Sequence, residues 1–203
     1  KNNNKNKEDL ELQKRRRVEI VQMPRRTTKI GKILDDYLKN CSEGSDETLH
    51  DKAIIQMLFG ANNLEVYKDI EKLLNDGVDV ICDRSIVSAI VYCPDELKSI
   101  HKHMLDQYEK ILYARADIFI LLDVKYGNAK KIIQRHKGGV DTLEKYEKNV
   151  KNLDQFSAGY NLYYYTELSK QKAIMIPADD DNQNIFDIHC QIREIVTNIF
   201  LDQ

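Results

Sequence analysis

Short apolar segments rich in β-branched residues alternate along this chain with longer segments of helical periodicity. The clearest is Ile118–Val124 (IFILLDV), a nearly continuous apolar run of the kind that is buried on both faces of a parallel sheet. Strands that are separated by helices pair in parallel, because a parallel connection needs a crossover of a dozen or more residues. The sequence therefore predicts an α/β fold, with a doubly wound parallel sheet and helices on both faces.

The elements of this sheet can be placed along the chain. The predicted strands are 18–22, 78–83, 118–124 and 173–176, and the predicted helices cover about 28–38, 46–75, 95–115, 128–135, 142–168 and 184–201. Ligands of such folds bind beyond the carboxyl ends of the strands. The residues that directly follow each strand are therefore the first candidates for a functional site.

Composition narrows the class of protein and its partners. A length of 203 residues is enough for one domain with a sizeable core, and the net charge of −2 gives no reason to expect nucleic acid or an anionic membrane as a partner. The longest apolar runs are of strand length, so we expect no membrane insertion. The four cysteines have no metal-binding or disulfide spacing, which is typical of an intracellular protein and leaves cytoplasm and mitochondrion open.

The first 17 residues differ from the rest. They begin with the polar, low-complexity run KNNNKNK, which favours disorder, and continue with EDLELQKRRR, which can form a short helix. The predicted organisation is thus a polar tail and short helix at 1–17, followed by one domain at 18–203. The chain begins with Lys1 rather than methionine, which suggests a processed or incomplete product.

Charged side chains follow the first two predicted strands. Arg25 and Arg26 stand on a loop just before a predicted helix, where a guanidinium and free backbone N–H groups suit a phosphate; the alternative is a solvated basic turn. Asp83 and Arg84 follow the second strand. The Asp83 carboxylate could orient Mg²⁺ through water, or it could simply cap the next helix.

After the third strand the chain carries Asp123, Arg135 and a segment with two adjacent glycines, Gly138 and Gly139. Adjacent glycines between helices are typical of a flexible segment that can act as a lid, and equally of a plain loop. We place the predicted lid at about 136–143.

Four segments together resemble the thymidylate kinase family, in order and spacing from about Val18 to the C-terminus. MPRRTTKIG resembles the family's F-P-x-R-x-T-x-I-G, LFGANNLE its L-F-S-A-N-R-W-E, and DTLEKYE its E-R-Y-E after the lid. LLNDGVDVICDRSIVSAIVY resembles its strand that ends in D-R-Y with a serine and an aromatic residue downstream. The resemblance implies a P-loop nucleoside-monophosphate (NMP) kinase-like fold and the transfer of a phosphoryl group from ATP to dTMP with Mg²⁺.

The resemblance also implies roles for individual residues on the phosphate side of the site. Arg26 and Arg84 would grip the 5′-phosphate of the acceptor nucleotide, and Asp83 would lie near Mg²⁺ and the reacting phosphates. Asp83 and Arg84 are the catalytic candidates of an active enzyme. This suits phosphoryl transfer, which depends mainly on positioning and on neutralising charge.

Other residues would form the base pockets. Phe59 would stack on the acceptor base, Asn63 would stand where the family's arginine reads the thymine edge, and Tyr92 and Tyr146 would line that pocket. Arg135 would lie against the donor adenine. No group of histidines, cysteines or carboxylates has a spacing that identifies a metal site with certainty.

Several departures from the family pattern bear on activity. No glycine precedes Val18, so the G-x-x-x-x-G-K-[ST] loop that cradles phosphates is missing from this sequence. Asn63 replaces the base-reading arginine, Ser85 replaces the tyrosine of D-R-Y, and Arg25 replaces an acidic residue. The lid has no arginine for the transition state.

These departures lead to three hypotheses. The first is a degenerate member that has lost phosphotransfer, needs no cofactor and serves as a structural or accessory subunit of a larger assembly. The second is an active dTMP kinase, using ATP and Mg²⁺, whose phosphate-binding loop lies upstream of Lys1. The third is a nucleotide-binding sensor that keeps only the acceptor site. We expect the first because a truncated chain would not explain Asn63 and Ser85.

The resemblance implies a protein partner as well. Members of the family pair as homodimers through the helices that correspond to Asp46–Asn75. In an accessory subunit, the same face could contact a different protein. An apolar stripe of core residues and one of interface residues look alike in sequence, so both partners stay open.

Overall fold

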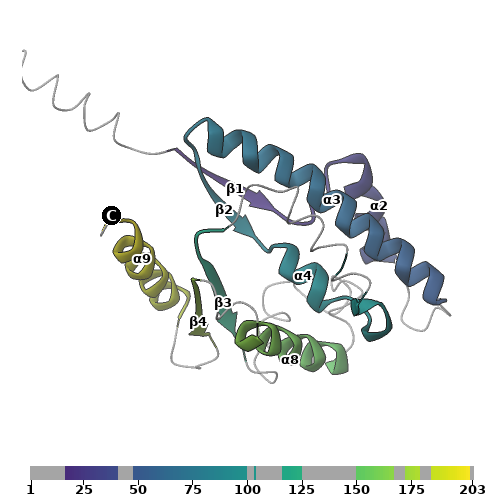
Figure 1. Ribbon diagram of the computed structural model, residues 1–203. Helices are drawn as coiled ribbons and strands as arrows, with labels where there is room; N and C mark the ends of the chain where they lie inside the picture. Colours follow the sequence, from purple (N-terminus) through teal and green to yellow (C-terminus); the bar gives the residue numbers. More distant parts are fainter. Residues whose placement is uncertain are drawn as a thin grey trace, which may run out of the picture. The chain divides into compact units, whose positions relative to one another are not determined.

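A computed structural model describes residues 17–40, 48–99, 103, 116–124, 150–166, 172–178 and 184–201 (Figure 1). The chain divides into two compact units. The first consists of Lys1–Tyr37 and Asp46–Arg115, and the second of Leu38–Ser45 and Ala116–Gln203. The first unit contains most of the predicted phosphate-side and acceptor-base residues.

The first unit is built on a pair of parallel strands. Strand β1 (Val18–Gln22) pairs with β2 (Asp79–Asp83) in a register that runs from Val18 opposite Asp79 to Gln22 opposite Asp83. Helices α2 (Lys29–Asn40) and α3 (Leu49–Asn75) make the crossover between the two strands. The pairing is parallel, as the alternation of strands and helices predicts.

The core of this unit lies between α3 and one face of the strand pair. Val66 and Ile70 of α3 pack against Val21 of β1 and against Met23, which follows it. Val66 is fully buried and Met23 is 2% exposed. Side chains alternate between the faces of a strand, so this packing fixes which residues of β1 and β2 face α3.

Polar groups define both ends of α3. Thr48 caps the first turn in a reciprocal pair with Asp51: its hydroxyl accepts from the Asp51 N–H at 3.2 Å, and the Asp51 carboxylate accepts from the Thr48 N–H at 3.0 Å. The Thr48 hydroxyl also donates to the Asp51 carboxylate at 2.7 Å, and this bond, together with the one from the Thr48 N–H, holds the pKa of the Asp51 carboxyl below its usual value. At the other end Gly77 has a φ of 74°, a conformation that glycine adopts without strain, and the chain turns into β2.

Two short helices follow β2. They are α4 (Ile86–Val91) and the 3₁₀ turn η1 (Asp95–Leu97). Four of the six residues of α4 are buried. The sequence predicts the helical segment that begins at Asp95, but it does not predict α4.

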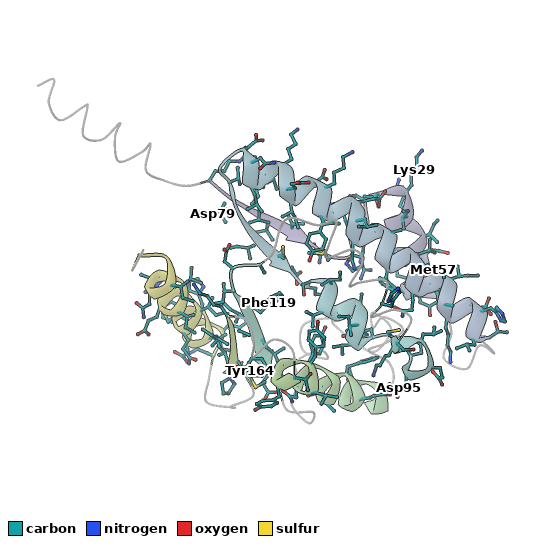
Figure 2. The ribbon with its side chains drawn as sticks, viewed as in Figure 1. Lys29, Met57, Asp79, Asp95, Phe119 and Tyr164 are labelled. Carbon is teal, nitrogen blue, oxygen red and sulfur yellow. The ribbon has the colours of Figure 1, made fainter. Side chains whose placement is uncertain are left out.

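The second unit repeats the parallel pairing. Strand β3 (Phe119–Asp123) pairs with β4 (Ala173–Pro177), and helices α8 (Val150–Thr166) and α9 (Ile185–Leu201) belong to the same unit. The Tyr164 hydroxyl donates to the Ala173 carbonyl oxygen at 3.4 Å and joins α8 to β4 (Figure 2). The apolar run thus forms a strand as predicted, but its residues are half-buried, with Leu122 46% exposed, rather than buried on both faces.

The predicted strands agree with the observed ones to within one residue at either end. Within the described ranges the four strands form two two-stranded parallel sheets, β1–β2 and β3–β4. The predicted helix at 128–135, the lid at 136–143 and residues 1–16 of the predicted tail lie outside the described residues. None of the helices in the described ranges combines the length and the apolar character that a bilayer crossing requires.

Candidate functional site

The carboxyl ends of β1 and β2 meet in the first unit. The Met23 N–H donates to the Asp83 carbonyl oxygen at 3.0 Å, and Gln22 Nε2 donates to Asp83 Oδ2 at 3.2 Å. The loop that carries Arg26 therefore starts beside the residue that precedes Arg84. The sequence predicts this proximity from the rule that parallel strands end at the same edge of a sheet.

Both arginines of the loop after β1 form ion pairs with helices of the same unit. Arg26 Nη1 lies 2.7 Å from Asp35 Oδ1 on α2, and Arg25 Nη1 pairs with Asp69 on α3. The Arg26 side chain is still 30% exposed. A guanidinium has five N–H donors, so an arginine can bind more than one anionic group.

Arg84 is held in an uncommon conformation after β2. Its φ is 68°, in the left-handed region that costs a non-glycine residue free energy. Its Nη1 donates to the Tyr92 hydroxyl at 3.3 Å, and its guanidinium carbon lies 5.7 Å from the centre of the Tyr92 ring. The structure thus brings together two of the predicted site residues, Arg84 and Tyr92.

Ser85, between Asp83 and α4, has a structural role that its replacement of the family's tyrosine does not suggest. Its Oγ accepts from the Val87 N–H at 3.2 Å and caps α4. The alternative interpretation of Asp83 as the cap of the next helix is therefore wrong, because Ser85 occupies that position. The Asp83 side chain is exposed and interacts with Gln22 instead.

Two of the predicted base-pocket residues, Phe59 and Asn63, belong to α3, a helix that contacts α4. Asn63 is 5% exposed and Phe59, one turn earlier, is half-buried. Gln56, two turns before Asn63 on the same face, is buried, and its Oε1 has no hydrogen-bond partner in the part of the chain that the structure describes. This face of α3 is therefore unusually polar for a buried helix surface.

Asn62 is not among the predicted site residues, yet its side chain forms hydrogen bonds with Arg25, Thr28 and Glu65. It is fully buried and forms hydrogen bonds with the loop after β1. One signal was available in the sequence: Asn62, Val66 and Ile70 recur at a spacing of four, which places an amide on the apolar face of α3.

The remaining predicted site residues cannot be placed. Arg135 and Tyr146 lie outside the described residues, as does the lid. Within the described ranges there is no cluster of three or more histidine, cysteine or carboxylate side chains that could hold a metal ion. The exposed Asp83 carboxylate fits Mg²⁺ in the way typical of phosphoryl-transfer sites, where one or two carboxylates and the substrate phosphates share the ion.

Comparison with known proteins decides the family. The sequence profile described as Thymidylate kinase matches residues 4–192. The chain belongs to the thymidylate kinase family. It is 27% identical over 183 residues to the thymidylate kinase of Schizosaccharomyces pombe (90% of this chain, 79% of the relative), and 28% identical over 192 residues to that of Plasmodium falciparum (94% and 81%).

A solved structure supports the same fold. The thymidylate kinase of Candida albicans superimposes with a TM-score of 0.62 at 22% identity, and covers 89% of this chain and 80% of its own. The predicted P-loop NMP-kinase-like fold and family are thereby confirmed. The comparisons give no support to the prediction that this member has degenerated, and they fit an active member of the thymidylate kinase family better.

The cap at Ser85 can be tested by substitution. We expect Ser85→Ala to lower the free energy of unfolding by about 1 kcal/mol, because it leaves an N–H group of α4 without its side-chain acceptor. Ser85→Asp keeps an acceptor and should stay close to the wild type. Urea denaturation measures both values. Ser99→Ala, at an exposed position, is the control, and equal losses for Ser85→Ala and Ser99→Ala would contradict the cap.

Proposed function

We propose that this chain forms the acceptor-nucleotide side of an active thymidylate kinase, which transfers the terminal phosphoryl group of ATP to dTMP and releases ADP and dTDP. One observation carries the proposal: the hydrogen bond from the Met23 N–H to the Asp83 carbonyl oxygen joins the loop of Arg26 to the turn of Arg84. Two guanidinium groups are thereby presented from adjacent strand ends, which suits a phosphate.

Each polar group near this junction has a place in such a reaction. Arg26 and Arg84 would bind the 5′-phosphate of dTMP and offset its charge as the acceptor oxygen approaches the transferred phosphoryl group. Asp83 would hold Mg²⁺, which neutralises charge on the phosphates when it is bound. Phe59, Asn63 and Tyr92 would surround the base. The family resemblance assigns Tyr146 to the same pocket and Arg135 to the donor adenine.

Two of the departures from the family pattern have local explanations, which favours activity over degeneration. Ser85 caps α4, so the missing tyrosine is replaced by a residue with a structural use. Arg25 stands where the family has an acidic residue, and it forms an ion pair with Asp69 of α3, which balances its positive charge. Asn63 remains a change in the base pocket, and we expect it to alter discrimination among acceptor bases rather than phosphate binding.

The proposal requires a phosphate-binding loop for ATP. None of the eight glycines in these 203 residues stands in the pattern G-x-x-x-x-G-K-[ST]. We take this loop to be supplied by sequence outside residues 1–203. The complete gene product is therefore the protein to assay.

The test is a coupled assay of ADP formation from ATP and dTMP, with Arg26→Gln as the variant. A charge-assisted hydrogen bond contributes about 1.5–3 kcal/mol, so kcat/KM for dTMP should fall about ten- to a hundredfold while KM for ATP stays the same. Arg17→Gln is the matched control, because Arg17 is exposed and pairs with Glu19.

Three results would count against the proposal in different ways. A complete protein that binds dTMP but releases no ADP would be a nucleotide sensor, and one that binds neither nucleotide would be an accessory subunit. Equal activity of Arg26→Gln and the wild type would remove Arg26 from the phosphate site while leaving the kinase reaction in place.

We also propose that a second copy of the chain covers the outer side of α3. Leu49, Ile54 and Met57 are each at least 50% exposed. By helical periodicity they lie on a side of α3 other than that of Val66 and Ile70, which pack on β1. Apolar side chains at such spacing form a stripe that self-association would remove from water.

Sedimentation velocity tests this pairing. We expect the wild type to sediment as a dimer and Met57→Lys to shift the population towards the monomer, because the substitution places a charge in the apolar contact. Lys52→Glu, at a partly exposed position of α3 outside the stripe, is the control. A monomeric wild type at micromolar concentration would contradict the proposed pairing, and a different protein partner for this face would then have to be sought.

A further inference from the structure

Asn62 is a buried amide on the apolar side of α3. It has no exposed surface, and Val66 and Ile70 follow it on the same face in contact with the core. A buried amide without partners would cost free energy, so its hydrogen bonds must compensate for the loss of water. Its partners Arg25 and Thr28 belong to a single loop far away in the sequence, and Glu65 on α3 is a further partner.

The carboxamide of Asn62 binds both polar backbone groups of Arg25. Its Oδ1 accepts from the Arg25 N–H at 2.8 Å, and its Nδ2 donates to the Arg25 carbonyl oxygen at 3.2 Å. One side chain thereby fixes the peptide groups on either side of Arg25. The second of these groups leads directly into Arg26, so its orientation determines where the Arg26 side chain begins.

The loop is also confined from the side of α2. A Cβ at Gly31 would lie 1.8 Å from the Arg25 carbonyl oxygen and 2.9 Å from the Arg26 Cα, so only glycine permits this approach. The Thr28 hydroxyl accepts from the Gly31 N–H at 2.9 Å and from Asn62 Nδ2 at 3.0 Å. The Arg25–Thr28 segment is therefore fixed between α2 and α3.

We infer that Asn62 is a positioning residue that sets the place of the Arg26 guanidinium relative to the base-pocket residues of α3. The inference rests on the proposed function. Asn63 follows Asn62 directly and Phe59 precedes it by one turn, so one helix carries both the base pocket and the anchor of the phosphate loop. The hydrogen bonds of Asn62 thus fix the distance between the loop that would bind the phosphate of the acceptor nucleotide and the residues that would bind its base.

This arrangement requires a side chain that both donates and accepts a hydrogen bond, as an amide does. An aspartate at this position could accept from the Arg25 N–H but could not donate to its carbonyl oxygen, and it would place a charge in the core. A leucine has a similar volume but forms neither bond. Asn62→Asp therefore removes one of the two hydrogen bonds to the Arg25 backbone and Asn62→Leu removes both, while Arg26 itself is unchanged.

The experiment compares Asn62→Leu, Asn62→Asp and Asn75→Leu in the complete gene product. Asn75 is the exposed last residue of α3, so its replacement controls for the Asn→Leu change on the same helix. The first readout is amide hydrogen exchange, which needs no ligand. We expect Asn62→Leu to speed exchange in residues 25–31 while exchange in the rest of α3 stays at the level of Asn75→Leu.

The second readout is kinetic and separates positioning from general damage. A phosphate-binding group that is misplaced by about 1 Å can reduce the rate about a hundredfold. We expect KM for dTMP to rise at least about tenfold in Asn62→Leu, with KM for ATP unchanged. The binding of thymidine, which lacks the phosphate, should remain as in the wild type.

Each outcome has a definite meaning. Faster exchange in the loop with an unchanged KM for dTMP would overturn the positioning role while the kinase function stands. Unchanged exchange in the loop would overturn the anchor itself. A wild type without turnover or dTMP binding would defeat the proposed function, and the exchange data would still decide whether Asn62 anchors the loop. If Asn62→Leu fails to fold, Asn62→Asp and Thr28→Val provide the same comparison.

Discussion

The hydrogen bonds between the Asn62 carboxamide and the backbone of Arg25 determine how the first unit presents its charged residues. Val66 and Ile70 anchor α3 to β1 through apolar contact, and apolar contact has no direction. The hydrogen bonds to the Arg25 N–H and carbonyl oxygen, at 2.8 and 3.2 Å, are directional and therefore orient the peptide groups on either side of Arg25. They turn the segment after β1 into a fixed loop whose next side chain is Arg26.

The junction of the two strand ends then connects this loop to a second cation. The Met23–Asp83 hydrogen bond places the start of the loop beside the turn of Arg84, where a φ of 68° and contact with Tyr92 hold the guanidinium. Backbone strain of this kind persists only where the surroundings impose it, and it is common at functional sites. These constraints are the basis of the proposed acceptor site, in which the two arginines would bind one phosphate, and the proposal fits membership of the thymidylate kinase family.

The sequence predicts the parts of this structure that depend on local pattern. The run IFILLDV forms β3, and the crossover helices α2 and α3 fall where the periodicity places them. It fails at Ile86–Val91, which is rich in β-branched residues yet helical, because Ser85 caps it and its side chains are buried. It fails again where distant residues decide. The partners of Asn62 and Arg25 lie 37 and 44 residues away, so no local pattern reveals them.

A crystal structure of the complete gene product with dTMP tests the central claim most directly. The account predicts the 5′-phosphate within about 3.2 Å of guanidinium nitrogens of both Arg26 and Arg84. It also predicts that the Asn62 carboxamide still bonds the Arg25 backbone and that the base lies beside Asn63. A phosphate bound away from both arginines, or a loop released from Asn62 while dTMP is bound, would contradict it.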